Sequence, residues 1–422
     1  MSGKLTRRAW LGAGAAALAL PAGAWLATRG DGARATAQAA LRPDPRRVLD
    51  LHEGFTYQVV DRAGGTMSDG FRAPARPDGM ACFAGEGGAL VLMRNHELPA
   101  GLRSRFVGAR WPDAAYDPEA GGAVSRLVLD PATLEVRAAN LVLCGTSMNC
   151  SGGASPWGWL SGEEDARDPS HGFVFLCDPS ATAAARPARI DAYGRFKHEA
   201  VALVPGTHVA YLTEDRGDGC LYRFVPHDPA RPFEGRLQAM RVRGRPGEDT
   251  SPLATGERRE VGWVELPEPV RSQDDLRHVA RRAGAASVRR GEGAAHDGAH
   301  LYVAATTGGP LGAGQILRVE DGPDGGVLDV LAASDDRARM DMPDNLALAP
   351  DGSLWFAEDG RGHDCVRTVR ADGSIVTLAR NAASEGEIAG LCFSPSGDTL
   401  FANLQEEGLT VAIRGPFTAL GA

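Results

Sequence analysis

Short apolar segments that end in polar or acidic residues recur along the chain. Each follows a glycine-containing turn and holds about four apolar or β-branched residues, as expected of a short β-strand. The clearest examples are GEGGALVLMRNHE, which ends at Glu97, GTHVAYLTED, which ends at Asp215, and PDGSLWFAEDG, which ends at Gly360. This pattern predicts a succession of short, buried strands separated by tight turns.

The spacing of the turns indicates how these strands are grouped. Asp-Gly or Ser-Gly turns begin at Asp297, Asp351 and Ser396, which are 54 and 45 residues apart. Such a period fits one four-stranded unit per repeat, and the 54 glycines and 27 prolines favour turns over long helices. Residues 273–288 have the best helical pattern, and we interpret them as an insertion. The sequence therefore predicts an all-β fold, a β-propeller.

The acids at strand ends are the first candidates for function. In a propeller the innermost strands surround a central channel, so side chains at their ends can meet near the axis. Carboxylates that crowd together in a buried site repel one another and resist ionisation unless cations neutralise them. The recurring acids therefore predict a metal site. The alternative for each single acid is an exposed loop residue that caps a turn.

The first 37 residues predict export. Arg7 and Arg8 precede an apolar, alanine-rich run, and Ala35–Ala37 offers small residues for cleavage, the pattern of a twin-arginine signal. We expect the twin-arginine translocation machinery as a partner and a periplasmic, cell-surface or extracellular location. The alternative is a membrane anchor, but the run of residues is only weakly hydrophobic for a segment that spans a membrane. Residues 38–50 are predicted to be a linker, and residues 51–422 a single propeller domain.

Charge and cysteine content narrow the classes of function. The chain has 45 basic and 54 acidic residues, a net charge of −9, and without the first 37 residues 40 basic and 53 acidic residues leave −13. Such a surface disfavours nucleic acid and anionic membranes, while a small phosphate ester could still bind at a local cationic site. The chain has seven cysteines, an odd number, and no two of them form a CxxC pair. Both facts argue against a disulfide framework or a zinc ribbon. We expect a monomer, because a propeller closes its own core.

One stretch combines a thiol with acids. In TSMNCSGGASPWGWLSGEED, Cys150 lies close in sequence to Glu163 and Glu164. A thiolate beside carboxylates mixes soft and hard ligands, a combination that iron accepts and that differs from an all-oxygen calcium site. The alternative is that Cys150 is a small buried core residue, which is common for cysteine.

Two further stretches place charged residues beside apolar strands. Glu199 follows His198 at the start of one apolar segment, and Arg290 lies two residues before Glu292. In an extended segment residues i and i+2 share a face, so Glu292 could bind a metal while Arg290 binds a phosphate oxygen. The alternative is a surface salt pair. The sequence has no G-x-S-x-G elbow, Walker loop or H-E-x-x-H motif that would support another hydrolase or a nucleotide-binding protein.

The chain resembles the PhoX-type alkaline phosphatase family in a series of stretches that run in order from Leu51 to the C-terminus. These stretches are PDGMACF, LMRNHEL, NCSGGASPWGWLSGEE, GRFKHEAV, RGEGAAHDGAHLYVAATT, MDMPDNLALAPDGSLWFAEDG and EIAGLCFSPSGDTLFANLQ. The resemblance implies a six-bladed β-propeller with insertions between blades. It also implies an axial site that holds iron and calcium ions, and metal-dependent hydrolysis of phosphate monoesters.

The resemblance also implies roles for single residues. Cys150 would be the thiolate ligand of iron, and Arg290 and Asn95 would hold phosphate oxygens. The remaining metal ligands would be carboxylates at Glu164, Glu199, Glu214 or Asp215, Glu292, Asp344 and Glu358. In one departure, the family's usual Arg-Pro-Glu is Arg290-Gly291-Glu292 here, and glycine fixes the backbone less than proline. We therefore expect Arg290 to be less rigidly aimed.

Two other functions remain open from the sequence. A calcium-dependent propeller hydrolase of lactones or phosphotriesters would also gather acids and amides at the axis, but it would need no thiolate, so Cys150 is the feature that separates the two enzymes. An exported propeller could also bind a partner protein without catalysis. In that case any bound metal ions would only stabilise the fold, or the axial site would bind no metal.

Overall fold

Most of the regular structure is β-strand. The computed structural model describes residues 41–99, 111–370 and 372–421. Within these ranges the helical elements are the α-helices α2 (Leu276–Arg282) and α3 (Phe417–Gly421) and the 3-10 turns η2 (Glu86–Gly88) and η3 (Asp191–Tyr193). Helix α2 lies inside the segment 273–288 that the sequence predicts as helical. In the described ranges, no helix combines the length and the apolar character that crossing a membrane requires. The predicted export signal lies outside these ranges.

The strands form five antiparallel sheets. The first two are four-stranded and follow chain order: β3 (Pro77–Ala84), β4 (Leu90–His96), β5 (Gly122–Leu129) and β6 (Val136–Thr146); then β7 (Asn149–Ser155), β8 (Gly158–Glu163), β9 (Val174–Cys177) and β10 (Ala188–Ile190).

The largest sheet has nine strands. Its first half comprises β11 (His198–Leu203), β12 (Ala210–Glu214), β13 (Tyr222–Pro226), β14 (Gly235–Val242) and β15 (Arg258–Glu265). Its second half continues from β15 in the order β19 (Gly325–Ala333), β18 (Gln315–Gly322), β17 (His300–Ala305) and β16 (Gly291–His296).

The last two sheets combine strands from both ends of the described chain. One has the order β1 (Leu49–Leu51), β23 (Ile375–Asn381), β22 (Cys365–Val369), β21 (Leu354–Glu358) and β20 (Pro343–Leu348). The other has the order β2 (Thr56–Arg62), β26 (Leu409–Arg414), β25 (Thr399–Leu404) and β24 (Ile388–Phe393). Strand β1 begins inside residues 38–50, the segment predicted to be a linker, and its Leu49 is buried in the core.

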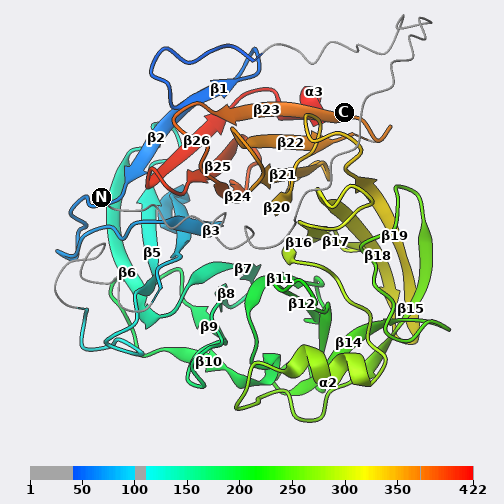
Figure 1. The fold of residues 1–422 in the computed structure, drawn as a ribbon. Helices are drawn as coiled ribbons and strands as arrows, with labels where there is room; N and C mark the ends of the chain where they lie inside the picture. The colour runs from blue at the N-terminus through cyan, green and yellow to red at the C-terminus, as the bar shows by residue number, and fades with distance from the viewer. Residues whose placement is uncertain (1–40, 100–110, 371, 422) are drawn as a thin grey trace, which may run out of the picture. The chain divides into compact units, whose positions relative to one another are not determined.

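The sheets are arranged in a ring. Strands β3, β7, β11, β16, β20 and β24 contact one another in that order, and β24 returns to contact β3. Figure 1 shows these strands around the middle of the ring, with later strands of each sheet outside them. The fold is therefore an all-β, propeller-like ring, as the sequence predicts.

The hydrophobic core lies between neighbouring sheets. In one cluster, Trp355 and Leu378 of the β20–β23 sheet pack with Leu400 and Val411 of the β24–β26 sheet. These four side chains are fully buried. Strands such as β4, β24 and β25 lie between neighbouring sheets and are buried along their whole length, which explains the short apolar runs in the sequence. Outer strands such as β2 and β14 carry exposed positions as well.

Each strand around the middle carries a β-bulge close to its first residue. In β3, Pro77 pairs with His96 and Met80 pairs with Arg94, so two residues of β3 oppose one residue of β4. The same irregularity occurs in β7, β11, β16, β20 and β24. A bulge interrupts the regular alternation of side chains along the strand. These bulges position the side chains of the candidate site.

Candidate metal centre

Two groups of buried ligands lie where the strands around the middle begin. The cysteine cluster comprises Glu97, Cys150 and Glu164, and the acidic cluster comprises Glu199, Glu292 and Asp344. Within each cluster, one ligand atom from every residue lies within 4.8 Å of the others. No member is more than 4% exposed. Three ligands so close together could bind one cation, and their burial makes an uncompensated cluster of negative charge costly.

The bulges explain which residues meet. Cys150, Glu199, Glu292 and Asp344 each occupy the first of the two bulge positions in their strand. The same position of β3 is Asp78, whose Oδ2 lies 3.6 Å from the Cys150 Sγ and accepts a hydrogen bond from the thiol. Asp78 therefore borders the cysteine cluster.

Sequence reasoning did not name Asp78 or Glu97 as site residues. The signal for Asp78 was the dipeptide Pro77-Asp78, which repeats Pro343-Asp344 at the start of an apolar strand. Glu97 ends an apolar segment in the same way as the other strand-end acids. Gln405 joins these two carboxylates, since its side-chain amide donates to Asp78 and, at 3.0 Å, to Glu97 Oε2.

The sixth bulge, in β24, has no side chain at this position. The residue is Gly390, with a left-handed φ of 63°. A Cβ there would lie 2.1 Å from the backbone oxygen of Asp78, a distance that no side chain can tolerate. Close approach of β24 to β3 therefore requires glycine at this bulge position.

The two clusters do not include Glu214 and Glu358, which the family resemblance implies as metal ligands. Glu214 Oε2 accepts hydrogen bonds from Cys220 N at 3.1 Å and from the Tyr222 hydroxyl at 2.8 Å. Burial raises the pKa of Glu214 to about 7. Glu358 Oε1 accepts from the Arg367 guanidinium and from a backbone N–H, both at 2.8 Å, and burial raises its pKa.

The pleat of the strand explains both differences. Glu163, Glu214 and Glu358 are the last residues of β8, β12 and β21, and successive side chains in a strand point to opposite faces. Glu163 accordingly binds backbone N–H groups and His171 within its own sheet. The next residue along the chain, Glu164, belongs to the cysteine cluster.

Asn95 does not lie where a phosphate oxygen could use its amide. The side-chain nitrogen donates to the backbone oxygens of Cys150 at 3.1 Å and Ser151 at 2.7 Å. The side-chain oxygen accepts from Trp159 Nε1 and the Ser161 hydroxyl, both at 2.8 Å. All four hydrogen-bonding positions of the amide are therefore used inside the protein, and they hold the bulge that carries Cys150.

Arg290 lies at the edge of the acidic cluster, where its side chain makes two ion pairs. Its backbone adopts a left-handed φ of 48°. Its Nη2 donates to Glu292 Oε1 at 2.6 Å, and its Nε donates to Asp215 Oδ1 at 2.8 Å. The side chain is 17% exposed, so a guanidinium beside the cluster remains accessible to a small anion.

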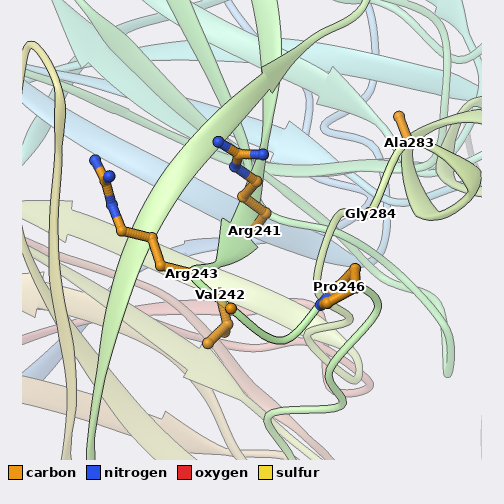
Figure 2. Close-up of a pocket in the computed structure, with 7 residues that line it drawn as sticks. Arg241, Val242, Arg243, Pro246, Ala283 and Gly284 are labelled. Carbon is orange, nitrogen blue, oxygen red and sulfur yellow. The ribbon is translucent and has the colours of Figure 1, made fainter.

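A surface pocket elsewhere has a different character. It is lined by Arg241, Val242, Arg243, Gly244, Pro246, Ala283 and Gly284 (Figure 2). Its titratable side chains are the two arginines, and it contains no carboxylate, thiol or imidazole. This pocket therefore offers no metal ligand, and the two clusters remain the candidate site.

Comparison with known protein families identifies the group of proteins to which this geometry belongs. The family model for alkaline phosphatase PhoX matches residues 121–408, more than half of the chain. The chain belongs to the PhoX family. The matched stretch contains Cys150, Glu164 and the whole acidic cluster, and it confirms the resemblance seen in the sequence. None of the curated protein sequences is significantly similar to the chain.

One solved PhoX structure agrees with this assignment at the level of the fold. Pseudomonas fluorescens PhoX in complex with vanadate, a transition state analogue, is 18% identical with a TM-score of 0.70, covering 89% of this chain and 97% of that one. A gluconolactonase from Xanthomonas campestris is 14% identical with a TM-score of 0.42, covering 86% and 99%. A putative 6-phosphogluconolactonase from Bacteroides uniformis is 14% identical with a TM-score of 0.44, covering 88% and 94%. The TM-scores of the two lactonase structures are below 0.5, and these two similarities carry no argument about function.

Proposed function

We propose that this PhoX family member is a metal-dependent phosphatase that hydrolyses phosphate monoesters at the two clusters. The observation that carries the proposal is the convergence of one thiol and five carboxylates, all buried, in two groups of cation-binding size. Family membership supports phosphate ester chemistry. The structural similarity to a PhoX bound to a transition state analogue supports the fold that such a site requires.

The donor sets fit two different cations. The cysteine cluster offers a sulfur with carboxylate oxygens, which suits iron, whereas the acidic cluster offers oxygen alone, which suits calcium. Both clusters are buried, so cations would remove the electrostatic cost of crowding the carboxylates. When bound, such cations polarise phosphoryl oxygens and acidify a water molecule, which makes a hydroxide nucleophile available near neutral pH.

The chain's own residues would orient the substrate and stabilise charge. Arg290 presents its guanidinium at the edge of the acidic cluster, where it would donate hydrogen bonds to phosphoryl oxygens as negative charge develops on them. Asn95 would act at a distance, because it holds the carbonyl groups of the Cys150 bulge. This proposal requires no serine nucleophile.

We also infer that the ring has six blades. The nine-stranded sheet would then be two blades, β11–β14 and β16–β19, joined through β15. This inference rests on the six strands that contact one another around the middle and on the bulge that each of them carries. Every blade would thus contribute one bulge position to the centre of the ring.

We propose export by the twin-arginine route for the same chain. The support is the sequence around Arg7 and Arg8. This route carries folded proteins, so the buried clusters could be loaded with metal before the protein leaves the cell. A reporter fusion whose transport depends on the twin-arginine machinery, and is lost when both arginines become lysine, is the expected result. Transport that is unaffected by this change would contradict the proposal.

The test of the proposed function is hydrolysis of an aryl phosphate monoester, compared with a lactone and a phosphotriester, by the purified full chain. We expect the monoester to be the preferred substrate. The change Glu292→Gln should lower the rate at least about a hundredfold, because it removes a charged ligand from the acidic cluster.

The matched control is Glu214→Gln. It makes the same chemical change at a buried strand-end glutamate that binds Tyr222 and Cys220 instead of a cluster, so most of the activity should remain. A preference for the lactone or the triester would favour the calcium-dependent alternative. Absence of turnover in a folded, metal-loaded sample would favour a binding propeller.

A further inference from the structure

Three basic residues immediately precede strands around the middle of the ring. Arg76 precedes β3, Lys197 precedes β11 and Arg290 precedes β16. Each therefore lies next to a bulge that carries a candidate ligand. The ring brings the starts of these three inner strands to its middle, although the three residues are far apart in the sequence.

Lys197 and Arg290 share one carboxylate. Lys197 Nζ lies 3.3 Å from Asp215 Oδ2, and Arg290 Nε lies 2.8 Å from Asp215 Oδ1. The ammonium and the guanidinium thus bind opposite oxygens of the same side chain. Asp215, which is 8% exposed, holds the two positive groups side by side.

Each of these cations also contacts a different metal-ligand cluster. Lys197 Nζ lies 2.8 Å from Glu164 Oε1 of the cysteine cluster, and Arg290 Nη2 lies 2.6 Å from Glu292 Oε1 of the acidic cluster. The Lys197 and Arg290 side chains are 19% and 17% exposed. An anion that reaches both clusters therefore meets both cations.

Arg76 differs from this pair. Its guanidinium binds Glu97 twice, through the backbone oxygen at 3.1 Å and through Oε2 at 2.8 Å. Asp215 joins Lys197 to Arg290, whereas Arg76 contacts Glu97. The inference therefore concerns the pair that Asp215 holds.

We propose that Lys197 is a second phosphate-binding cation, aligned with Arg290 by Asp215, and that it selects dianionic phosphate monoesters over monoanionic diesters. This inference rests on the proposed phosphatase function. A lysine ammonium acts as a compact point charge, whereas an arginine guanidinium is a planar fork. The extra negative charge of a monoester gains from a second cation, while a diester has one charge fewer to neutralise.

The test compares Lys197→Met with wild type in two measurements on the metal-loaded full chain. Calorimetry measures the binding of inorganic phosphate, and steady-state kinetics measure kcat and KM for a monoester and for a diester. We expect Lys197→Met to weaken phosphate binding about 10- to 100-fold, the usual range for loss of a charged hydrogen bond. Its kcat/KM should fall more for the monoester than for the diester, and Lys197→Arg should recover part of both losses.

The matched control is Arg289→Met. Arg289 is adjacent to Arg290, carries one positive charge and binds Asp249 on the surface with 48% of its side chain exposed. Its loss should leave phosphate binding and the monoester preference unchanged. Metal content and thermal stability of all variants establish that the site and the fold are intact.

The possible outcomes separate this inference from the proposed function. If wild type hydrolyses monoesters and Lys197→Met binds phosphate equally well, the inference is wrong and the function stands. If Lys197→Met loses metal or stability but keeps the same monoester preference, Lys197 is a structural partner of Glu164 and Asp215, and the inference is again wrong. If wild type neither binds phosphate nor hydrolyses any ester, both fail.

Discussion

At the residue scale, the candidate site depends on which of two consecutive acids faces the middle of the ring. Glu163 and Glu164 differ by one position, yet the first binds its own sheet and the second joins the cysteine cluster. The same holds for the next pair of acids. Glu214 accepts a hydrogen bond from Tyr222, whereas Asp215 binds Lys197 and Arg290. The first acid of each pair is buried and accepts hydrogen bonds away from the clusters, and for Glu214 this has a measurable consequence for stability.

Glu214 predicts a pH dependence of the free energy of unfolding. Burial, opposed by Arg277 and Tyr222, raises its pKa from 4.5 to about 7. The folded protein then binds this proton more tightly than the unfolded chain does, so the contribution to stability is full below pH 4.5 and is lost as the pH rises through about 7. The shift corresponds to about 3 kcal/mol.

Chemical denaturation of wild type and Glu214→Gln across this range measures the effect. The difference in unfolding free energy between the two proteins should fall by most of that amount from about pH 4.5 to about pH 8. The glutamine cannot titrate, so it provides the reference. Identical pH profiles for the two proteins would show that Glu214 does not titrate with a raised pKa.

At the scale of single elements, the bulged strands both position the ligands and pack tightly against one another. A Cβ at Gly153 in β7 would lie 1.8 Å from the backbone oxygen of Val201 in β11. No rotation of a side chain relieves such a contact, because the backbone fixes the position of the Cβ and the oxygen belongs to the backbone of Val201. The spacing of neighbouring strands, and with it the spacing of their ligands, depends on this residue.

The change Gly153→Ala should therefore destabilise the protein by about 1–3 kcal/mol or more, the cost of overpacking a well-filled interior. Guanidinium denaturation measures the change. Gly217→Ala is the control, since a Cβ there meets no atom within 4 Å. Equal stability of the two variants would contradict the close approach of β7 and β11.

The same elements determine how far the sequence could predict the site. Turn residues and apolar runs predicted the strands, and acids at strand ends predicted the class of ligand. The bulges could not be read from the pattern, because one inserted residue shifts the side-chain alternation by one position. Asp344 was found from its motif although it lies in a bulge. Glu214 and Glu358, the last residues of β12 and β21, lie outside both clusters, and their role as metal ligands stays a prediction. Cys150 was found because a cysteine close in sequence to acidic residues is recognisable without knowing which face of the strand it occupies.

At the scale of the whole described ring, closure joins the two ends of the chain. Strand β2 pairs with β26 in the last sheet, and β24 of that sheet contacts β3 of the first. Arg94 of β4 connects these two sheets, because its guanidinium binds Asp61 of β2 and Thr410 of β26, each at 2.6 Å. Its side chain is 1% exposed, so it is a buried ionic connection across the closure.

Replacing Arg94 by methionine should lower the free energy of unfolding by roughly 3 kcal/mol, because it leaves the Asp61 carboxylate without its cation and removes one of the two hydrogen bonds of Thr410. The control is Arg137→Met, which removes an exposed ion pair with Asp130 in the same sheet and should cost less than about 1 kcal/mol. Urea or guanidinium titration of both variants provides the comparison. A loss for Arg94→Met no larger than that of the control would mean that this contact does not stabilise the closure.

The most direct test of the central claim is elemental analysis of the folded chain, which counts iron and calcium per molecule in wild type and in Cys150→Ala. The account predicts iron together with calcium in wild type. It predicts loss of iron with retention of calcium in the variant, because the thiol belongs to one cluster and the all-oxygen ligands to the other. A well-folded wild type that takes up neither metal, or a Cys150→Ala variant that keeps its full iron content, would contradict it.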